Sequence, residues 1–435
     1  MADMKRWASA QRASRPHVLA TAGLSALLIA TMVPTAGASA APQPDYFDAP
    51  SSATVRSLGD IGTPATSQIC EFYPEYCAFF PSATPGMGIP LGGIGAGNFM
   101  INQSGTFGPW WFGGSQGANH AYEVRALPQA AFHVFEKVGT DEPTVTTLAT
   151  EGPQRDDPAQ SWESPLAGWN TLDVGEADYG ALYPFGWMDY NTDKFESDVK
   201  LRFYSPIVAG EDERSSLPVA HFDIQITNSS STDAANVSAM FTMPNVAAHA
   251  GIEPATVREG LTAEYRERRG IKAVTLSSDS DANTPDAYRS EWTIAAAPAR
   301  GQTVSYVTSW NADGDGADIY TEFADGALSN GALDQSASAG AIAVSAELAP
   351  GESTTIPLVM TWDFPQVAFQ DNDTVWMRRY TEFYGAETNA QNEYVDGSYA
   401  FHQSFNIAKD ALADRRKNLT DVLEWWQPIV DDNGY

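Results

Sequence analysis

Four aromatic side chains in this sequence have the chemistry to bind a sugar ring. Each offers a flat apolar face against which sugar C–H groups can stack, and each indole N–H or phenol O–H can hydrogen-bond a hydroxyl group. Rings of this size also dominate protein interiors and interfaces, so packing is the competing interpretation. The four candidates for glycan binding are Trp110, Trp111, Trp187 and Tyr190.

A second candidate site is the oxygen-rich loop at residues 311–322. Its spacing is that of an EF-hand calcium loop, although Asn replaces the usual first Asp and Asp318 replaces an apolar residue. The alternative is a polar turn in which Asp318 caps a short helix over residues 319–324. Calcium is the only cofactor that the sequence suggests, and its predicted ligands are Asn311, Asp313, Asp315 and Glu322.

Paired carboxylates or clustered histidines would indicate catalysis or a transition metal. Asp178, Asp189 and Glu196 lie near the second aromatic segment, but acidic residues of this kind are usually solvated at the surface. His133 and His221 lie in strand patterns and are expected to be hydrogen-bonded within a sheet, and the six histidines show no metal-ligand spacing. These patterns therefore name no catalytic residue.

The two cysteines, Cys70 and Cys77, predict a disulfide bond that closes a short loop. Pro74 between them favours a turn, and an isolated even pair in an exported chain usually forms a disulfide. A zinc site needs four ligands, and no neighbouring Cys or His supplies the other two.

Residues 1–40 have the pattern of an export signal. Basic residues precede an apolar run at residues 18–33, and Ala38-Ser39-Ala40 offers a small-residue cleavage site. A membrane anchor is the alternative, but the apolar run is shorter than the roughly 20 residues that a spanning helix needs. We therefore expect a secreted or extracytoplasmic protein with no membrane span after cleavage.

Acidic residues dominate the rest of the chain. Residues 1–40 hold four of the 25 basic residues and one of the 55 acidic ones, which leaves 21 basic and 54 acidic residues and a formal net charge of −33. Such a surface repels phosphate backbones and anionic lipids, so binding to nucleic acid or to a membrane surface is not expected.

Short strands fill most of the chain. Apolar and polar residues alternate between turn residues, and residues 228–231 are expected to close an antiparallel hairpin between strands at 217–227 and 237–243. No helical pattern alternates with these strands, which favours an antiparallel β-sandwich over a parallel α/β sheet. Further strands are predicted at residues 130–136, 199–207, 271–276, 303–310, 341–348 and 354–362.

After Asp371 the apolar period changes from 2 to about 3.6. Apolar residues recur at helical spacing from Phe401 to Trp426, which predicts one long amphipathic helix over residues 398–427, ended by Pro428. An apolar face of this size needs a surface to pack on, so the helix either folds back on the sandwich or contacts a partner domain.

The most distinctive segment is GIPLGGIGAG at residues 88–97, followed by GTFGPWWF at residues 105–112. It is not a dinucleotide-binding motif, because Asn98 stands where the third glycine should be and no helical pattern follows. We expect the glycines to provide positive φ angles and close backbone approach in a tight β connection.

This segment resembles the opening signature of glycoside hydrolase family 116, the family of bile-acid β-glucosidases and non-lysosomal glucosylceramidases. Three later segments resemble the family in the same order, so the resemblance runs from about residue 85 to residue 428. They are ALYPFGWMDY at residues 181–190, the strand and turn that open with SLPV at 216–219, and LAPGES at 348–353 with WDFP at 362–365.

The resemblance implies an N-terminal antiparallel β-sandwich, a helical connection and then an (α/α)6 barrel that holds the two catalytic carboxyl groups of a retaining β-glucosidase. Family members continue into that barrel after the WQP segment, here residues 426–428. We therefore expect a truncated member with no catalytic residue, an accessory or structural role, and a catalytic domain or polypeptide as partner. A free-standing secreted carbohydrate-binding protein is the alternative.

The predicted fold is mainly β, a large antiparallel sandwich followed by a helical segment. Its parts are a signal peptide at 1–40, an N-terminal arm with the Cys70–Cys77 loop at 41–84, the β-sandwich at 85–368 and a helical connector at 369–435.

Overall fold

The fold comes from a computed structural model in which the chain divides into two compact units, Met1–Asp45 and Tyr46–Tyr435. All described residues belong to the second unit. The predicted signal peptide and the Cys70–Cys77 loop lie outside the described residues. Those residues are 47–59, 88–111, 127–151, 164–245, 260–278, 291–368, 375–390 and 394–431.

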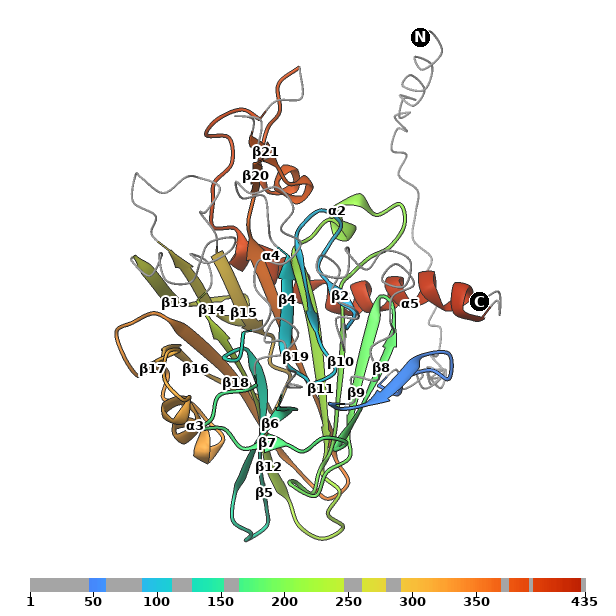
Figure 1. The fold of residues 1–435 in the computed structure, drawn as a ribbon, viewed down its shortest axis with the longest axis vertical. Coiled ribbons are helices and arrows are strands. Elements are labelled where there is room, and N and C mark those ends of the chain that lie inside the picture. The colour runs from blue at the N-terminus through green and yellow to red at the C-terminus, as the bar shows by residue number, and fades with distance from the viewer. Residues whose placement is uncertain are drawn as a thin grey trace, which may run out of the picture. The chain divides into compact units, whose positions relative to one another are not determined.

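The larger of two main sheets has nine strands in the order β1-β8-β9-β10-β11-β19-β15-β14-β13, all antiparallel to their neighbours (Figure 1). Strand β1 comes from the predicted N-terminal arm, which therefore contributes an edge strand. The strands are β1 (Thr54–Ser57), β8 (Ala177–Leu182), β9 (Phe185–Tyr190), β10 (Asp198–Tyr204), β11 (Val219–Thr227), β13 (Leu261–Arg268), β14 (Ile271–Ser278), β15 (Glu291–Ala296) and β19 (Ser353–Asp363).

The second main sheet has seven strands in the order β17-β16-β18-β12-β5-β6-β7, and only its two terminal pairs are parallel. A three-stranded sheet and a two-stranded sheet complete the β structure. The strands of the seven-stranded sheet are β5 (Ala131–Val138), β6 (Thr144–Thr150), β7 (Thr171–Leu172), β12 (Ala235–Pro244), β16 (Thr303–Ser309), β17 (Gly331–Ala332) and β18 (Ala339–Leu348). The three-stranded sheet contains β2 (Pro90–Leu91), β3 (Asn98–Ile101) and β4 (Phe107–Trp111), and the two-stranded sheet contains β20 (Gln366–Ala368) and β21 (Val375–Met377).

The main hydrophobic core lies between the facing sides of these two sheets. Phe222 of the nine-stranded sheet packs with Phe132 and Phe241 of the seven-stranded sheet, with ring centroids 5.1 and 5.7 Å apart. Every second residue of a strand points to this side, so the alternation that predicted the strands also supplies the core. The predicted mainly β fold with large antiparallel sheets is confirmed.

The predicted hairpin between residues 217–227 and 237–243 is wrong in its pairing. Strand β11 pairs with β10 and β19, whereas β12 belongs to the other sheet and pairs with β18 and β5. The turn after β11 therefore carries the chain from one sheet to the other, beside the similar crossing from β18 to β19. The Asn228 side chain joins the two crossings, because its Nδ2 donates hydrogen bonds to the carbonyl oxygens of Asp233, Leu348 and Ala349.

The glycine-rich segment makes the tight connection from β2 to β3, as predicted. Gly92, Gly95 and Gly97 have positive φ angles of 127°, 75° and 85°. The backbone N–H of Gly93 donates a 2.9 Å hydrogen bond to the carbonyl oxygen of Leu217, so two backbone segments meet there with no room for a side chain.

The C-terminal helical pattern forms two helices rather than the single helix predicted over residues 398–427. They are α4 (Ser404–Ala413) and α5 (Arg415–Asp431), interrupted at Asp414. Pro428 lies inside α5, which continues for three residues beyond it. A proline removes one backbone N–H and crowds the carbonyl group of the preceding turn, so Pro428 weakens the last turn of α5 without ending the helix there. Sequence periodicity predicted the helical face but not its interruption.

Helical turns elsewhere are short, and among the described residues no helix is long and apolar enough to cross a membrane. The remaining turns are α2 (Asp212–Ser215), α3 (Ala317–Glu322), η4 (Phe323–Asp325) and η5 (Arg379–Tyr384).

The close backbone approach at Gly93 gives a first prediction. A Cβ atom placed at Gly93 would lie 2.5 Å from the Leu217 carbonyl oxygen, so Gly93→Ala forces the two segments apart and lowers the free energy of unfolding by roughly 2 kcal/mol. Gly331→Ala is the matched control, because a Cβ there meets no atom within 4 Å. Urea unfolding of both variants measures the difference, and equal stabilities would contradict the predicted crowding.

Candidate functional site: a buried polar layer beneath the C-terminal helices

The outer face of the nine-stranded sheet carries polar residues that the C-terminal helices cover. In β15, Trp292 and Ile294 point into the sandwich core, while Glu291 and Thr293 point to the opposite side. Helix α4 packs across β14, β15 and β19 on that side through Phe405 and other apolar residues. The outer face is therefore a second buried layer, in which polar groups need partners within the protein.

Two carboxyl groups lie directly opposite each other in this layer. Glu291 and Asp363 are register partners in the ladder of β15 and β19, and each is only 1% exposed. Like charges at directly opposed positions of a sheet repel each other. Burial, reinforced by the charge of Glu291, raises the pKa of Asp363 above its usual range despite the hydrogen bonds it accepts. This pair is stable only if surrounding donors compensate its charge.

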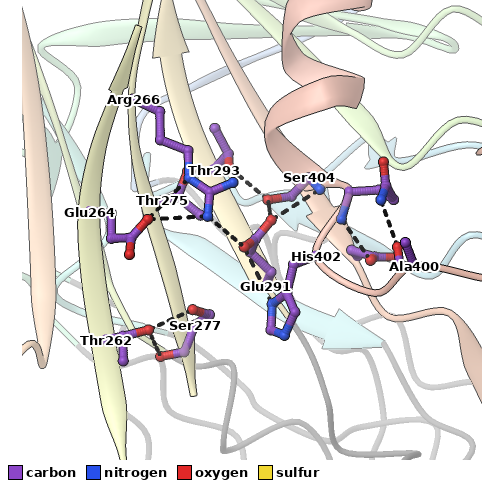
Figure 2. A network of polar contacts seen from close by, with 12 residues as sticks. Thr262, Glu264, Arg266, Thr275, Ser277, Glu291, Thr293, Ala400, His402 and Ser404 are labelled. Carbon is purple, nitrogen blue, oxygen red and sulfur yellow. Dashed lines mark hydrogen bonds and ion pairs between the residues drawn. The ribbon is translucent and has the colours of Figure 1, made fainter. Parts of the chain in front are cut away.

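The donors for Glu291 come mainly from the segment that leads into α4 (Figure 2). The Oγ and backbone N of Ser404 donate hydrogen bonds of 2.5 and 3.2 Å to Glu291 Oε1. His402 Nδ1 lies 3.3 Å from Glu291 Oε2, and an Arg266 guanidinium nitrogen lies 3.9 Å from the same oxygen. Glu291 thus connects the sheet to the first residue of α4.

Asp363 holds the same segment from the neighbouring strand. The hydroxyl groups of Tyr380 and Tyr399 each donate a 2.8 Å hydrogen bond to Asp363 Oδ1. The backbone N of Gln403 donates a 2.9 Å hydrogen bond to Asp363 Oδ2. One carboxyl group therefore binds three separate positions between residues 380 and 403.

Threonine hydroxyls extend this network across the sheet. Thr275 and Thr293 are hydrogen-bonded to each other at 3.0 Å, and Thr293 contacts the Ser404 hydroxyl at 2.6 Å. Thr361 donates a 2.7 Å hydrogen bond to the Ser404 carbonyl oxygen. Figure 2 shows Ser404 in contact with Thr293 and Glu291 of β15. Together with the bond from Thr361, these contacts fix the start of α4 to β15 and β19, and Thr293 extends the network to β14.

A second charged group holds the start of α5. Asp223 of β11 is fully buried, and its two oxygens accept from Arg202 at 2.7 Å and from Arg415 at 2.6 and 2.7 Å. Burial would raise the pKa of Asp223, but the charges of Arg415 and Arg202 and their hydrogen bonds lower it overall. Arg202 also lies over the ring of Phe47, 4.5 Å from its centroid. Asp223, Arg202 and Arg415 are called the Asp223 triad below.

These carboxylates are arranged to bind protein segments. A retaining glycosidase pair flanks an open sugar site with its carboxyl groups about 5 Å apart. Glu291 and Asp363 are instead buried, and their oxygens contact the chain between residues 380 and 404. The predicted surface acids Asp178 and Asp189 are partners across β8 and β9, and Asp189 lies 3.5 Å from Lys200.

Three of the four predicted sugar-binding aromatics lie in hydrophobic clusters. Trp110, Trp187 and Tyr190 are 1%, 6% and 4% exposed, and Trp110 stacks on Phe99 with a centroid distance of 4.4 Å. Trp111 belongs to β4, and its side chain lies outside the described part of the structure. The packing interpretation describes the three buried rings, and binding of glycans by these residues stays a prediction.

Three of the four predicted calcium ligands accept hydrogen bonds from backbone N–H groups. Asn311 Oδ1 accepts from the N–H of Asp313, Asp315 Oδ1 from Ala317, and Glu322 Oε1 from Ser329, at 3.1, 3.0 and 2.7 Å. Asp318 lies in the first turn of α3 rather than at a cap, since the helix begins at Ala317. No group of three or more His, Cys, Asp or Glu within the described ranges is placed to hold a metal. Calcium binding stays a prediction.

Two facing, mainly antiparallel sheets define the class of this protein as a β-sandwich, and the helices α4 and α5 pack on the outer side of one sheet. Residues 88–404 match the sequence profile described as beta-glucosidase 2, glycosyl-hydrolase family 116 N-term. The chain therefore belongs to the N-terminal region of glycosyl hydrolase family 116, as its four motifs indicated.

A solved structure described as a proposed kojibiose phosphorylase from the human microbiome also matches. It shares 8% sequence identity with this chain at a TM-score of 0.32, and the match covers 79% of this chain and 35% of that one. The chain thus spans about a third of the length of that protein. A likeness this low implies nothing about the activity of the present chain.

The contact between His402 and Glu291 predicts a pH dependence. The hydrogen bond to Glu291 raises the pKa of His402 from its ordinary value of 6.5. The pair therefore stabilises the fold below pH 6.5, and this contribution is lost as the pH rises through the pKa of the folded state. Replacing His402 with Asn tests this, because Asn tolerates the positive φ of 71° at this position.

We expect wild type to exceed His402→Asn in melting temperature most at about pH 5.5, and the difference to shrink toward pH 9. Burial lowers the pKa of His133 to about 3 and that of His221 to about 4. Both residues are present in wild type and variant, so their effects on the melting temperature cancel when the two proteins are compared. A difference that does not vary with pH would show that the pair contributes no charge interaction.

The Asp223 triad gives a third prediction. Arg415→Met keeps the aliphatic part of the side chain but leaves the buried Asp223 with only Arg202, so the free energy of unfolding should fall by about 3 kcal/mol. Arg416→Met is the control, because Arg416 is exposed and its replacement should change stability by less than about 0.5 kcal/mol. Urea unfolding followed by circular dichroism measures both, and similar values for the two variants would refute the assignment.

Proposed function

We propose that this chain is the N-terminal β-sandwich region of a secreted family 116 glycoside hydrolase of the β-glucosidase or glucosylceramidase type, and that its role is structural or accessory. The family profile supports this proposal, because it describes the N-terminal region and its match ends at residue 404. Ser404 is the first residue of α4 and the centre of the polar layer. The layer thus fixes the direction in which the chain leaves the matched region.

The use of the buried carboxylates supports a non-catalytic role. Among the sites described above, Glu291 and Asp363 most resemble a catalytic pair of carboxyl groups. Both accept hydrogen bonds from the chain between residues 380 and 404, namely from Ser404, Tyr380 and Tyr399. A general acid or nucleophile must contact substrate, whereas these groups are enclosed. In this proposal hydrolysis of β-glucosides belongs to an (α/α)6 catalytic domain or polypeptide.

An exposed apolar surface near the end of α5 is the proposed contact with that partner. Trp425 and Ile429 of α5 are 42% and 38% exposed, and Tyr183 packs edge-on against the neighbouring Trp426 at 5.4 Å. Large apolar side chains in water commonly mark interaction sites. The surface lies on the helix that follows the matched region, where a barrel would be joined or docked, and from there the sandwich would shape one rim of the sugar site.

Binding to a separately expressed (α/α)6 domain of a family 116 β-glucosidase tests this function. We expect the full secreted chain to bind that domain in calorimetry, and Trp425→Ala to weaken binding at least about tenfold because a central aromatic contact is lost. Trp376→Ala is the matched control, since Trp376 is 53% exposed on β21, away from α5. Failure of the wild-type chain to bind would overturn the partner assignment.

Two measurements separate the proposed role from the other possibilities. The purified chain should not hydrolyse an aryl β-glucoside; turnover abolished by one acidic substitution would establish an enzyme instead. It should also migrate normally in glycan affinity gels. Retardation removed by Trp110→Ala or Trp111→Ala, in protein that remains folded, would favour a carbohydrate-binding protein.

A further inference from the structure

A group of buried polar atoms lies beneath the first turns of α5, beside the Asp223 triad. Tyr204 and His221 are completely buried, and Asn418 and Arg202 are 1% and 3% exposed. Five of their atoms have no hydrogen-bond partner within the described part of the chain. They are the Tyr204 hydroxyl oxygen, both ring nitrogens of His221, Arg202 Nε and Asn418 Oδ1. The direct contacts of the protein leave these atoms unsatisfied.

The strand register and the helix period bring these atoms to one place. Tyr204 and His221 are partners across β10 and β11, and their rings stack with centroids 4.9 Å apart and an interplanar angle of 12°. Arg202 and Asp223, two residues along the same strands, point to the same outer side. Asn418 follows Arg415, which binds Asp223, by three residues and so lies on the same face of α5.

Two sides of this region are closed. The Asp223 triad closes one side, and on the other Val422 packs with Tyr204, Phe185 and Trp187 in a hydrophobic cluster. Buried polar atoms without partners are strongly disfavoured, and native proteins satisfy nearly all of them through protein or ordered water. Five such buried atoms on the neighbouring elements β10, β11 and α5 therefore point to a bound molecule between these elements.

The kinds of atom identify the chemistry of that molecule. Burial lowers the pKa of His221 to about 4, so its ring is neutral near pH 7, with one nitrogen donating and the other accepting. Arg202 Nε donates, Asn418 Oδ1 accepts and the Tyr204 hydroxyl does both. A cation would meet Arg202, and an anion would meet the accepting atoms of His221 and Asn418. A molecule that both donates and accepts satisfies the whole set.

We propose that this region is a hydration site, in which a small cluster of ordered water molecules joins β10 and β11 to α5. A buried water molecule normally makes about three hydrogen bonds, and the five unpartnered atoms supply them. In this proposal α5 contacts the sheet through three adjacent parts: the Asp223 triad, the water cluster and the hydrophobic contacts of Val422.

The variant Tyr204→Phe distinguishes a hydrated from a dry site by the direction of its effect. If water binds the hydroxyl, its removal breaks a hydrogen bond and should lower the melting temperature by about 1–3 °C. If the hydroxyl is dry and unpaired, its removal relieves a buried polar group and raises the melting temperature. An increase or an unchanged melting temperature overturns the proposal.

Tyr179→Phe supplies the matched control for the loss of a satisfied buried hydroxyl. The Tyr179 hydroxyl donates a 2.9 Å hydrogen bond to the Ile101 carbonyl oxygen and accepts one from the N–H of Ile89 at 3.2 Å. We expect both variants to shift the melting temperature in the same direction. A crystal structure of the full chain gives an independent test: water within hydrogen-bond distance of Tyr204 and His221 supports the site, and direct contact between these side chains and Asn418 overturns it.

Discussion

The burial of charge on the outer face of the nine-stranded sheet is the constraint on which the C-terminal part of the structure depends. A buried carboxylate without partners costs several kcal/mol, so Asp223, Glu291 and Asp363 are tolerable only when the helical segment supplies their donors. Arg415 and Ser404 are two of these donors, and both belong to α4 or α5. The sheet and the helices therefore depend on each other, because neither surface is satisfied alone. Removing one partner of a buried charge pair leaves the other charge uncompensated, which typically costs about 3–5 kcal/mol.

Alternation of apolar residues was enough to predict the strands and the sandwich class. It failed between β11 and β12, because a strand that turns back in its own sheet and a strand that crosses to the facing sheet have the same alternation. The difference lies in the long-range hydrogen bonds of Asn228 to Leu348 and Ala349, which local sequence does not reveal. The glycine-rich connection was predictable for the opposite reason, since positive φ angles are a local requirement.

The polar layer was not predicted at all. Glu291, Asp363 and Asp223 occupy the second face of their strands, where a polar residue normally indicates solvent. Only the helices make these positions buried, and the pairing of Asp223 with Arg415 joins residues far apart in the sequence. Asp223 did carry a weak signal, because a charge within the apolar strand β11 requires a partner. The predicted aromatic site depends on exposure of the rings. Trp110 and Trp187 have the chemistry to bind sugar, but local sequence does not show whether a ring face is covered, and both side chains are buried in the structure.

The hydrophobic cluster around Val422 has a consequence for the order of folding. Ala49 and Ala53 of the N-terminal arm pack in the same cluster as Leu419, Leu423 and Trp426 of α5. This cluster cannot be completed until α5 has been synthesised, whereas most sandwich strands are available earlier. Contacts between such distant segments form slowly, because a long loop must close before they contribute. The outer face of the sheet is therefore open to water for a time, and until α5 is in place water hydrates the carboxyl group of Asp223.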